Sequence, residues 1–321
     1  MRIVHEVFGL RATGGLNIPS ASLWLDGLPR QGIAFRSDLE RLPRRLHRRL
    51  CSRVLAELLG NRAGQPLAMP YETPFNLGSM TVELLPAGSG LGASLMRMQL
   101  EGRSVLYAAS AQPDRLPTSS PLSVVPADIL VLDASLAVEP QSSCEELRLA
   151  VDRQVQRSCA GGGGVVWLVE RRALAMDIAH LVGDRLPLYG SHGLRDLARR
   201  YQRVQVAVPR IRSFRQRLPE IAHVVWPLDR ASTLAGGAAA SWPRMVVKER
   251  LSEEDLQQQG GLAGLAFSAR ASGPALDRLI DLFQPVDVVA FGAGAADLCR
   301  RQEGGAARMW HLVDDVQLSL V

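Results

Sequence analysis

Short stretches of apolar residues, some alternating with polar residues and some continuous, dominate the first 140 residues of the chain. Gly, Pro and Asn separate the stretches, a pattern that predicts β-strands joined by turns. Residues 44–59 differ, because Leu46, Leu50 and Val54 recur at helical spacing before Gly60, so that we expect a helix there. The predicted strands are residues 2–8, 22–26, 32–35, 80–85, 94–100, 104–109 and 129–133.

After Pro140 the pattern changes to helices that alternate with strands. Ser143 and Glu146 have the spacing of a capping box and predict the start of a helix that runs through residue 157. An Ala- and Gly-rich segment, 231–243, predicts a connection. The other predicted helices are residues 173–182, 194–202, 274–283 and 295–301, and the other strands are residues 165–169, 204–208, 265–268 and 286–291, followed by closing strands.

This three-part pattern predicts an α/β protein in which a core domain is interrupted by an inserted domain of about 100 residues. We expect the first part of the core at residues 1–140, the insertion at 141–243 and the second part of the core at 244–321.

Composition narrows the class of protein. The 321 residues are 47% apolar and 21% charged, which is typical of a globular chain. The net charge is +5, with 36 arginines and the single lysine Lys248, and this charge allows nucleic acid as a partner without requiring it. The sequence has no long apolar run and no basic start followed by an apolar core, so we expect a cytoplasmic protein without membrane contact. Four widely spaced cysteines indicate neither a disulfide framework nor a zinc ribbon.

Familiar catalytic motifs are weak or missing in the sequence. Gly292-Ala-Gly294 resembles a dinucleotide-binding turn, but only 27 residues follow it, which is too few for a nucleotide-binding half-domain. No two of the six histidines are spaced i,i+2 or i,i+4, so no converging zinc site is visible.

Three segments resemble, in order and spacing, the motifs of the metallo-β-lactamase-fold nucleases of the β-CASP group. Residues 84–93 (LLPAGSGLGA), 102–110 (GRSVLYAAS) and 128–136 (DILVLDASL) are similar to PAGHxLGSA, YTGDYS and DILIxESTYG of that family. The resemblance is to the branch of bacterial ligase-associated DNA exonucleases and mRNA 3′-end processing factors. It implies an αββα sandwich with an inserted α/β β-CASP domain. Further similar segments are 15–26, 266–272 and 285–293.

The same resemblance implies that the metal ligands have been replaced. The family's HxHxDH loop corresponds to residues 36–41, RSDLER, which contain no histidine. Two acids that support the site in the family are retained as Asp26 and Asp133. The resemblance therefore implies that zinc is absent, that no other cofactor takes its place, and that the chain is a pseudoenzyme. The degenerate positions are Arg36, Asp38, Glu40, Arg41, Ser89, Ser110, Arg270, Ser272 and Gly292.

Arginines at these positions suggest phosphate binding. The resemblance implies that Arg36, Arg41 and Arg270 converge on the former metal cleft, where guanidinium groups could hold a phosphate without cutting it. The alternative is that they pair with Asp38 and Glu40 and fill the space. A second basic feature is a stripe on the predicted first helix, in which Arg41, Arg45 and Arg48 or Arg49 share one face that could contact nucleic acid or an acidic partner.

The expected function is that of a non-catalytic subunit or scaffold in nucleic-acid processing, in DNA repair, with an active nuclease, helicase or ligase as its protein partner. Two alternatives stay open. One is a nuclease with a rebuilt site in which Asp26, Asp38, Glu40 and Asp133 hold magnesium or manganese. The other is a module that binds DNA or RNA without a protein partner.

Overall fold

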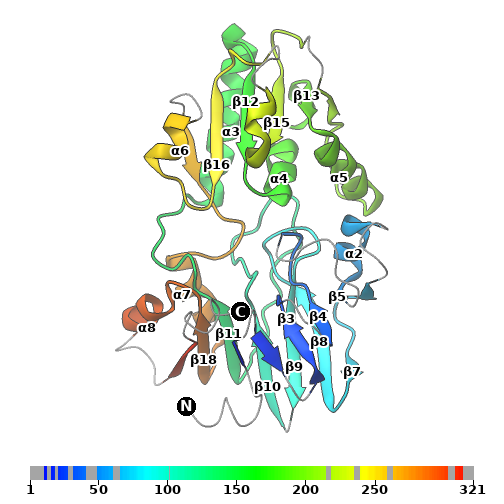
Figure 1. The fold of residues 1–321 in the computed structure, drawn as a ribbon, viewed down its shortest axis with the longest axis vertical. Helices are drawn as coiled ribbons and strands as arrows, with labels where there is room; N and C mark the ends of the chain where they lie inside the picture. The colour runs from blue at the N-terminus through cyan, green and yellow to red at the C-terminus, as the bar shows by residue number, and fades with distance from the viewer. Residues whose placement is uncertain are drawn as a thin grey trace. The chain divides into compact units, whose positions relative to one another are not determined.

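The chain folds into two compact units in the computed structural model. Unit 1 comprises Met1–Arg115, Ser119–Glu139 and Arg270–Val321, and unit 2 comprises Leu116–Thr118 and Pro140–Ala269 (Figure 1). The expected strand at residues 2–8 lies outside the described residues. The structure describes residues 11–12, 16–18, 21–27, 32–40, 49–60, 66–100, 102–214, 218–234, 239–258, 263–302 and 308–313.

Two β-sheets form most of unit 1. The first has the strand order β1-β2-β3-β4-β5-β6, and β3 to β6 run parallel. The second has the order β19-β18-β11-β10-β9-β8-β7, and β10, β11, β18 and β19 run parallel. The strands of the first sheet are β1 (Arg11–Ala12), β2 (Leu16–Ile18), β3 (Leu23–Leu25), β4 (Ile33–Phe35), β5 (Arg49–Ser52) and β6 (Leu67–Met69). Those of the second are β7 (Phe75–Leu77), β8 (Met80–Pro86), β9 (Ser94–Leu100), β10 (Arg103–Tyr107), β11 (Ile129–Asp133), β18 (Asp287–Phe291) and β19 (Met309–Val313).

The second sheet is buried on both faces, and β11 shows why its sequence is continuously apolar. Successive side chains of a strand point to opposite faces. Ile129 and Val131 accordingly belong to the core shared with the first sheet, whereas Leu130 and Leu132 belong to the core on the other face. β11 therefore contributes side chains to both cores.

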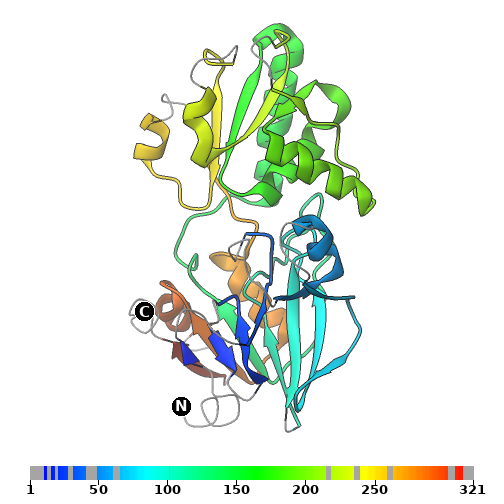
Figure 2. The ribbon, with the colours of Figure 1, turned by 45° about the vertical axis from the view of Figure 1, so that its right-hand side comes forward.

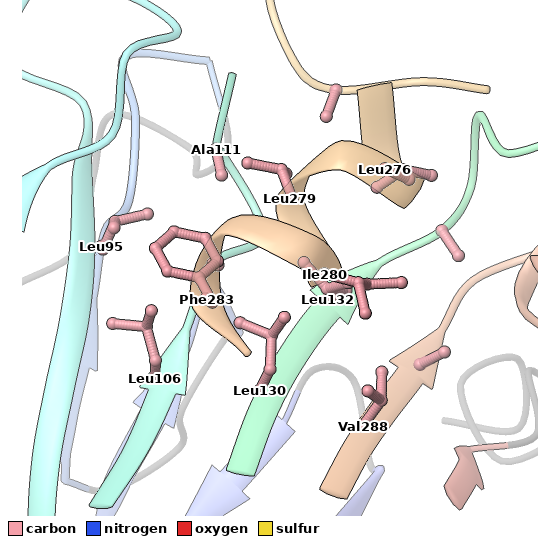
Figure 3. Close-up of a cluster of buried hydrophobic side chains, with 14 of the residues drawn as sticks. Leu95, Leu106, Ala111, Leu130, Leu132, Leu276, Leu279, Ile280, Phe283 and Val288 are labelled. Carbon is pink, nitrogen blue, oxygen red and sulfur yellow. The ribbon is translucent and has the colours of Figure 1, made fainter. Parts of the chain in front are cut away.

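Helices cover the outer face of the second sheet. In α7 (Pro274–Phe283), Ile280 and Phe283 lie over Leu130 and Leu106 of the sheet (Figure 3). Unit 1 is therefore layered as sheet, sheet and helix. The other helices of this unit are α8 (Ala295–Gln302), which packs into the same core, and α2 (Arg53–Leu59), which follows β5.

Unit 2 is an α/β unit around a parallel sheet with the strand order β14-β13-β15-β12-β16-β17 (Figures 1 and 2). Its central strand, β12, is fully buried, and Val166 and Leu168 pack with Val224 and Val246 of the neighbouring strands. The strands are β12 (Val165–Val169), β13 (Leu188–Gly190), β14 (Arg212–Ser213), β15 (His223–Pro227), β16 (Arg244–Lys248) and β17 (Gly264–Ala266). The α-helices are α3 (Cys144–Arg157), α4 (Arg172–Val182), α5 (His192–Arg203) and α6 (Glu253–Gln258), and the short helices are η3 (Ser158–Gly162), η4 (Gly183–Arg185) and η5 (Leu228–Leu234).

The general α/β class predicted from the sequence is confirmed, as are several individual elements. The capping box of Ser143 and Glu146 opens α3 with both of its reciprocal hydrogen bonds. No helix among the described residues is long and apolar enough to span a membrane.

The helix expected over residues 44–59 is wrong in part. Its described portion begins with the strand β5, and only Arg53–Leu59 is helical. Leu50 and Cys51 are fully buried between β4 and β6, so that sheet pairing overrides the helical periodicity. Ser52 then ends the strand and caps α2, where its hydroxyl accepts a hydrogen bond from the Leu55 amide.

Two further expectations in the inserted region differ from the structure. Residues 204–208 form a turn and irregular chain after α5 instead of a strand. The core was expected to resume at residue 244, but β16 pairs with β12, and unit 2 extends to Ala269.

Candidate functional site

The carboxyl ends of several parallel strands in unit 1 carry the polar residues singled out in the sequence. Ser110 follows β10, Asp133 ends β11, and Gly292 follows β18. Because these strands are parallel, their carboxyl ends lie at one edge of the sheet, which is where α/β proteins bind ligands. In the first sheet, Asp26 and Arg36 directly follow the parallel strands β3 and β4.

A chain of side-chain hydrogen bonds joins the two sheets at this edge. The Ser37 hydroxyl donates to Asp26 Oδ2 at 2.5 Å and lies 2.6 Å from the Ser110 hydroxyl oxygen. Ser110 donates to Asp38 Oδ2 at 2.8 Å, and the Tyr107 hydroxyl donates to Asp26 Oδ2 at 3.0 Å. We call these five residues the carboxylate–hydroxyl cluster. Its serines link the carboxylates of Asp26 and Asp38 through two hydroxyl groups.

Backbone contacts fix the loop that carries the cluster. The Ser37 amide donates to Asp26 Oδ1 at 2.8 Å, and the Glu40 amide donates to Asp38 Oδ1 at 2.7 Å. Arg36 is only 1% exposed, and its guanidinium donates from Nε to the Asp38 carbonyl at 2.9 Å and from Nη2 to the Leu39 carbonyl at 2.5 Å. Arg36 thus stabilises the loop from within.

A second polar group lies at the end of β11. Arg270 Nη1 lies 2.6 Å from Asp133 Oδ2, and both side chains are largely buried. The other oxygen, Asp133 Oδ1, accepts from the Ser135 amide at 2.9 Å and from the Ser135 hydroxyl at 2.5 Å. Asp133 therefore already has a cationic partner and two neutral donors.

Gly292 makes this arrangement sterically possible. Its φ is +94°, which side chains rarely tolerate, and a Cβ built there would lie 2.3 Å from the Ser135 hydroxyl oxygen and 3.1 Å from Asp133 Oδ1. The position that the family resemblance assigned to a lost histidine thus has no room for a side chain in this structure.

Ser89 is placed close to the loop of the cluster. The preceding residue, Gly88, forms an isolated antiparallel bridge with Ala111, next to Ser110. Ser89 is 3% exposed, and its hydroxyl has no hydrogen-bond partner among the described residues.

Six of the predicted site residues thus fall into two groups. Asp26, Asp38 and Ser110 belong to the cluster, and Asp133, Arg270 and Gly292 belong to the second group. Sequence reasoning missed Ser37, Tyr107 and Ser135, three hydroxyl donors to the retained acids, and the only signal for Ser37 and Ser135 is that each lies one or two residues from an acid.

The structure describes three of the arginines that were expected to bind phosphate or nucleic acid, and all three are buried or paired. Arg36 and Arg270 contact carbonyl and carboxylate groups of unit 1, which agrees with a space-filling role more than with two open phosphate ligands. Arg49 lies on β5 and is 1% exposed, so it does not belong to an exposed helical stripe. Burial lowers the pKa of its guanidinium. The other arginines named for these surfaces, Arg41, Arg45 and Arg48, lie outside the described residues.

Metal ions in proteins are held by converging His, Cys, Asp or Glu side chains. In the part of the chain that the structure describes, no three His, Cys, Asp or Glu side chains come together as a possible ligand set. Asp26 and Asp38 are linked through serine hydroxyls, so each offers oxygens that already accept hydrogen bonds.

Asp177 and His223 are titratable groups buried in unit 2, apart from the cluster. Asp177 on α4 accepts from the Thr118 amide and hydroxyl, and its burial raises its pKa to about 6. His223 on β15 accepts from Trp167 Nε1 at 3.1 Å through Nδ1, and burial lowers its pKa to about 4. Because the indole can only donate, the neutral imidazole carries its proton on Nε2, facing Ser158 at 3.2 Å.

Comparison with known proteins adds information on the fold alone. No family model and no curated protein matches the chain. Among solved structures, a protein of unknown function from Enterococcus faecalis V583 is similar, with a TM-score of 0.58 and 11% sequence identity. The similarity covers 88% of this chain and 79% of that chain, so it extends over an α/β fold that includes most of both units.

Proposed function

We propose that this chain is a non-catalytic member of the metallo-β-lactamase/β-CASP fold and serves as a scaffold subunit in nucleic-acid processing in the cytoplasm, in DNA repair. The observation that carries the proposal is the carboxylate–hydroxyl cluster. Its acids are engaged in joining the two sheets, at the edge where an enzyme of that fold would hold its metal ions.

The layering of the chain supports the fold part of the proposal. Two sheets share a core, helices cover the outer face of the second sheet, and a parallel α/β unit interrupts the sequence of the first unit. An αββα sandwich with a β-CASP insertion shares these features, and it has in addition a second helical layer over its other sheet. The order of the resembling segments along β8, β10, β11 and β18 agrees with it as well.

The chemistry of the edge supports the non-catalytic part. Metal-assisted hydrolysis needs converging ligands and an open position for water. Here Asp133 pairs with the guanidinium of Arg270, and this positive charge opposes a cation at the same oxygen. Ser37, Ser110 and Tyr107 donate to Asp26 and Asp38, so that a cation would have to break these hydrogen bonds.

The proposal is tested with the purified full chain and labelled single- and double-stranded DNA and RNA, in the presence of magnesium, manganese or zinc. We expect no cleavage above the level of an Asp38→Asn variant prepared in parallel. Metal-dependent cleavage that disappears in Asp38→Asn and persists in Ser110→Ala would overturn the proposal in favour of a rebuilt nuclease site.

A second measurement addresses the scaffold role. The tagged chain is purified from its own cells, and bound proteins are identified by mass spectrometry before and after nuclease digestion. We expect a stoichiometric nuclease, helicase or ligase that survives digestion. Loss of all bound proteins on digestion would contradict the scaffold role and favour a module that binds nucleic acid directly.

A further inference from the structure

Unit 2 contains a pocket of about 660 Å³ between α5 and the edge strand β14. Its walls include four arginines, together with Tyr189 and Ser213. The arginines are Arg195, Arg199, Arg210 and Arg212.

Local structure explains why four arginines converge there. Arg195 and Arg199 are four residues apart on α5, so they occupy the same face of the helix. Arg210 and Arg212 belong to the continuous segment 210–213, just before and in β14, which lines the pocket on the side of the sheet edge. The pocket thus lies between an arginine pair on the helix and an arginine pair at the sheet edge.

The positive charge of the pocket is only partly compensated. No Asp or Glu is among the described residues that line it. Arg199 lies 3.4 Å from Asp196, but this carboxylate is also bonded to Arg200 at 2.6 Å. Arg195 donates to the neutral hydroxyl of Ser213 at 3.0 Å. Clustered like charges repel one another, so an anion in the pocket would be stabilised by several of them at once.

We propose that this pocket binds the phosphate groups of a nucleotide-sized ligand, either as a free nucleotide or as part of a single strand. Guanidinium groups form paired hydrogen bonds with phosphate oxygens, so the four arginines of the lining suit a phosphate ligand. The volume falls in the range of sites for small ligands, about 300–1,000 Å³. Tyr189 and Ile211 also line the pocket, where they are 8% and 6% exposed. This inference goes beyond the proposed function and does not depend on the carboxylate–hydroxyl cluster.

The test measures binding of the full chain to fluorescent ATP and to a labelled single strand of about 12 nucleotides. The pocket variant is Arg210→Glu with Arg212→Glu. The matched control is Arg153→Glu with Arg157→Glu, which makes the same change of charge at two exposed positions on α3 that do not line the pocket. Circular dichroism and thermal melting confirm that each variant is folded.

We expect the pocket variant to bind about tenfold or more weakly than the wild type, with a shallower dependence on salt, and the control to stay within about threefold. Competition of both probes by inorganic pyrophosphate would identify a free phosphate ligand, whereas binding of the strand alone would identify nucleic acid. Binding to neither probe at about 0.1 M salt, or equal losses in the two double variants, would overturn the proposal. If the variant Arg210→Glu with Arg212→Glu does not fold, the single variant Arg212→Gln must still bind the probes with a shallower dependence on salt than the wild type. The partner-capture experiment is read out separately, so failure here leaves the proposed function unaffected.

Discussion

The hydroxyl oxygens of Ser37 and Ser110 lie 2.6 Å apart and connect the carboxylates of Asp26 and Asp38, which come from the loops after β3 and β4. Three oxygen–oxygen contacts make up this chain, and in the contact between Ser37 and Ser110 either hydroxyl can be the donor. The contact between Ser37 and Ser110 also fastens the first sheet to the second, because Ser37 follows β4 and Ser110 follows β10.

Removal of the Ser110 hydroxyl tests how much this link contributes to stability. We expect Ser110→Ala to lower the free energy of unfolding by about 1–3 kcal/mol, because Ser37 and Asp38 each lose a buried hydrogen-bond partner. Urea unfolding measures the change. Ser79→Ala, on an exposed turn of the same unit, should stay within about 0.5 kcal/mol of the wild type. Equal effects of the two substitutions would show that the cluster does not stabilise the fold.

A carboxylate at position 110 should destabilise unit 1 more than a neutral side chain of the same shape. Ser110→Asp would place a third acid between Asp26 and Asp38, so we expect it to destabilise unit 1 by about 3 kcal/mol more than Ser110→Asn at pH 7. The gap should narrow as the pH falls towards 4, because protonation removes the repulsion. Thermal melting of the two variants across this pH range provides the comparison. A gap that does not change with pH would contradict the electrostatic explanation.

Gly292 is expected to tolerate no side chain. Gly292→Ala combines an unfavourable backbone conformation with a Cβ 2.3 Å from the Ser135 hydroxyl oxygen, so we expect a loss of about 2 kcal/mol or more. Gly102→Ala is the matched control, because its φ is +78° and nothing lies within 4 Å of its Cβ. Chemical denaturation of both variants separates the cost of the backbone conformation from the cost of the steric contact. The free energy of unfolding of the control should fall by only about 1 kcal/mol. Similar losses at both sites would mean that the contact with Ser135 relaxes at little cost.

Asp177 and His223 should oppose each other in the pH dependence of stability. Burial raises the pKa of Asp177 from 3.8 to about 6, so the folded state binds more protons than the unfolded state, and stability falls by about 3 kcal/mol as the pH rises from 4 to 6. Burial lowers the pKa of His223 from 6.5 to about 4, so the unfolded state binds more protons, and stability rises by about 3 kcal/mol between pH 4 and 6.5.

Single substitutions should reveal each of these slopes. In Asp177→Asn, the free energy of unfolding should rise as the pH increases from 4 to 6.5. In His223→Gln, it should fall as the pH increases from 4 to 6. In the wild type the two slopes oppose each other, so the free energy of unfolding should change little over the shared range. Urea unfolding followed by tryptophan fluorescence at each pH gives the three curves, since Trp167 contacts His223 within unit 2. Parallel curves for wild type and Asp177→Asn would contradict the raised pKa of this acid.

Elements that depend on local pattern could be predicted from the sequence. The continuous apolar run of β11 predicted a strand, since both of its faces are buried, and Ser143 predicted the start of α3. β5 could not be recognised, because Leu50 fits a helical pattern as well as a strand, and only its pairing with β4 and β6 decides. The boundary at residue 243 failed for a similar reason, because β16 pairs with β12 about 80 residues earlier in the sequence.

The candidate site was predictable in its positions but not in its contacts. Asp26 and Asp133 were recognised from the motifs around them. The roles of Ser37 and Tyr107 depend on how the two sheets meet, since Tyr107 reaches Asp26 from a strand that is 81 residues away in the sequence. Hydroxyl groups are common at such positions, and nothing in the local sequence marks these as partners of an acid.

The position of the arginine pocket has a consequence for association between chains. β14 is an edge strand, and an open edge offers unpaired amide and carbonyl groups to any other strand. This edge is only two residues long and carries Arg212, with Arg210 just before it. A second copy of the chain that approached in register would bring the same positive charges together, so the residues that form the pocket also protect this side of unit 2 against strand addition and aggregation.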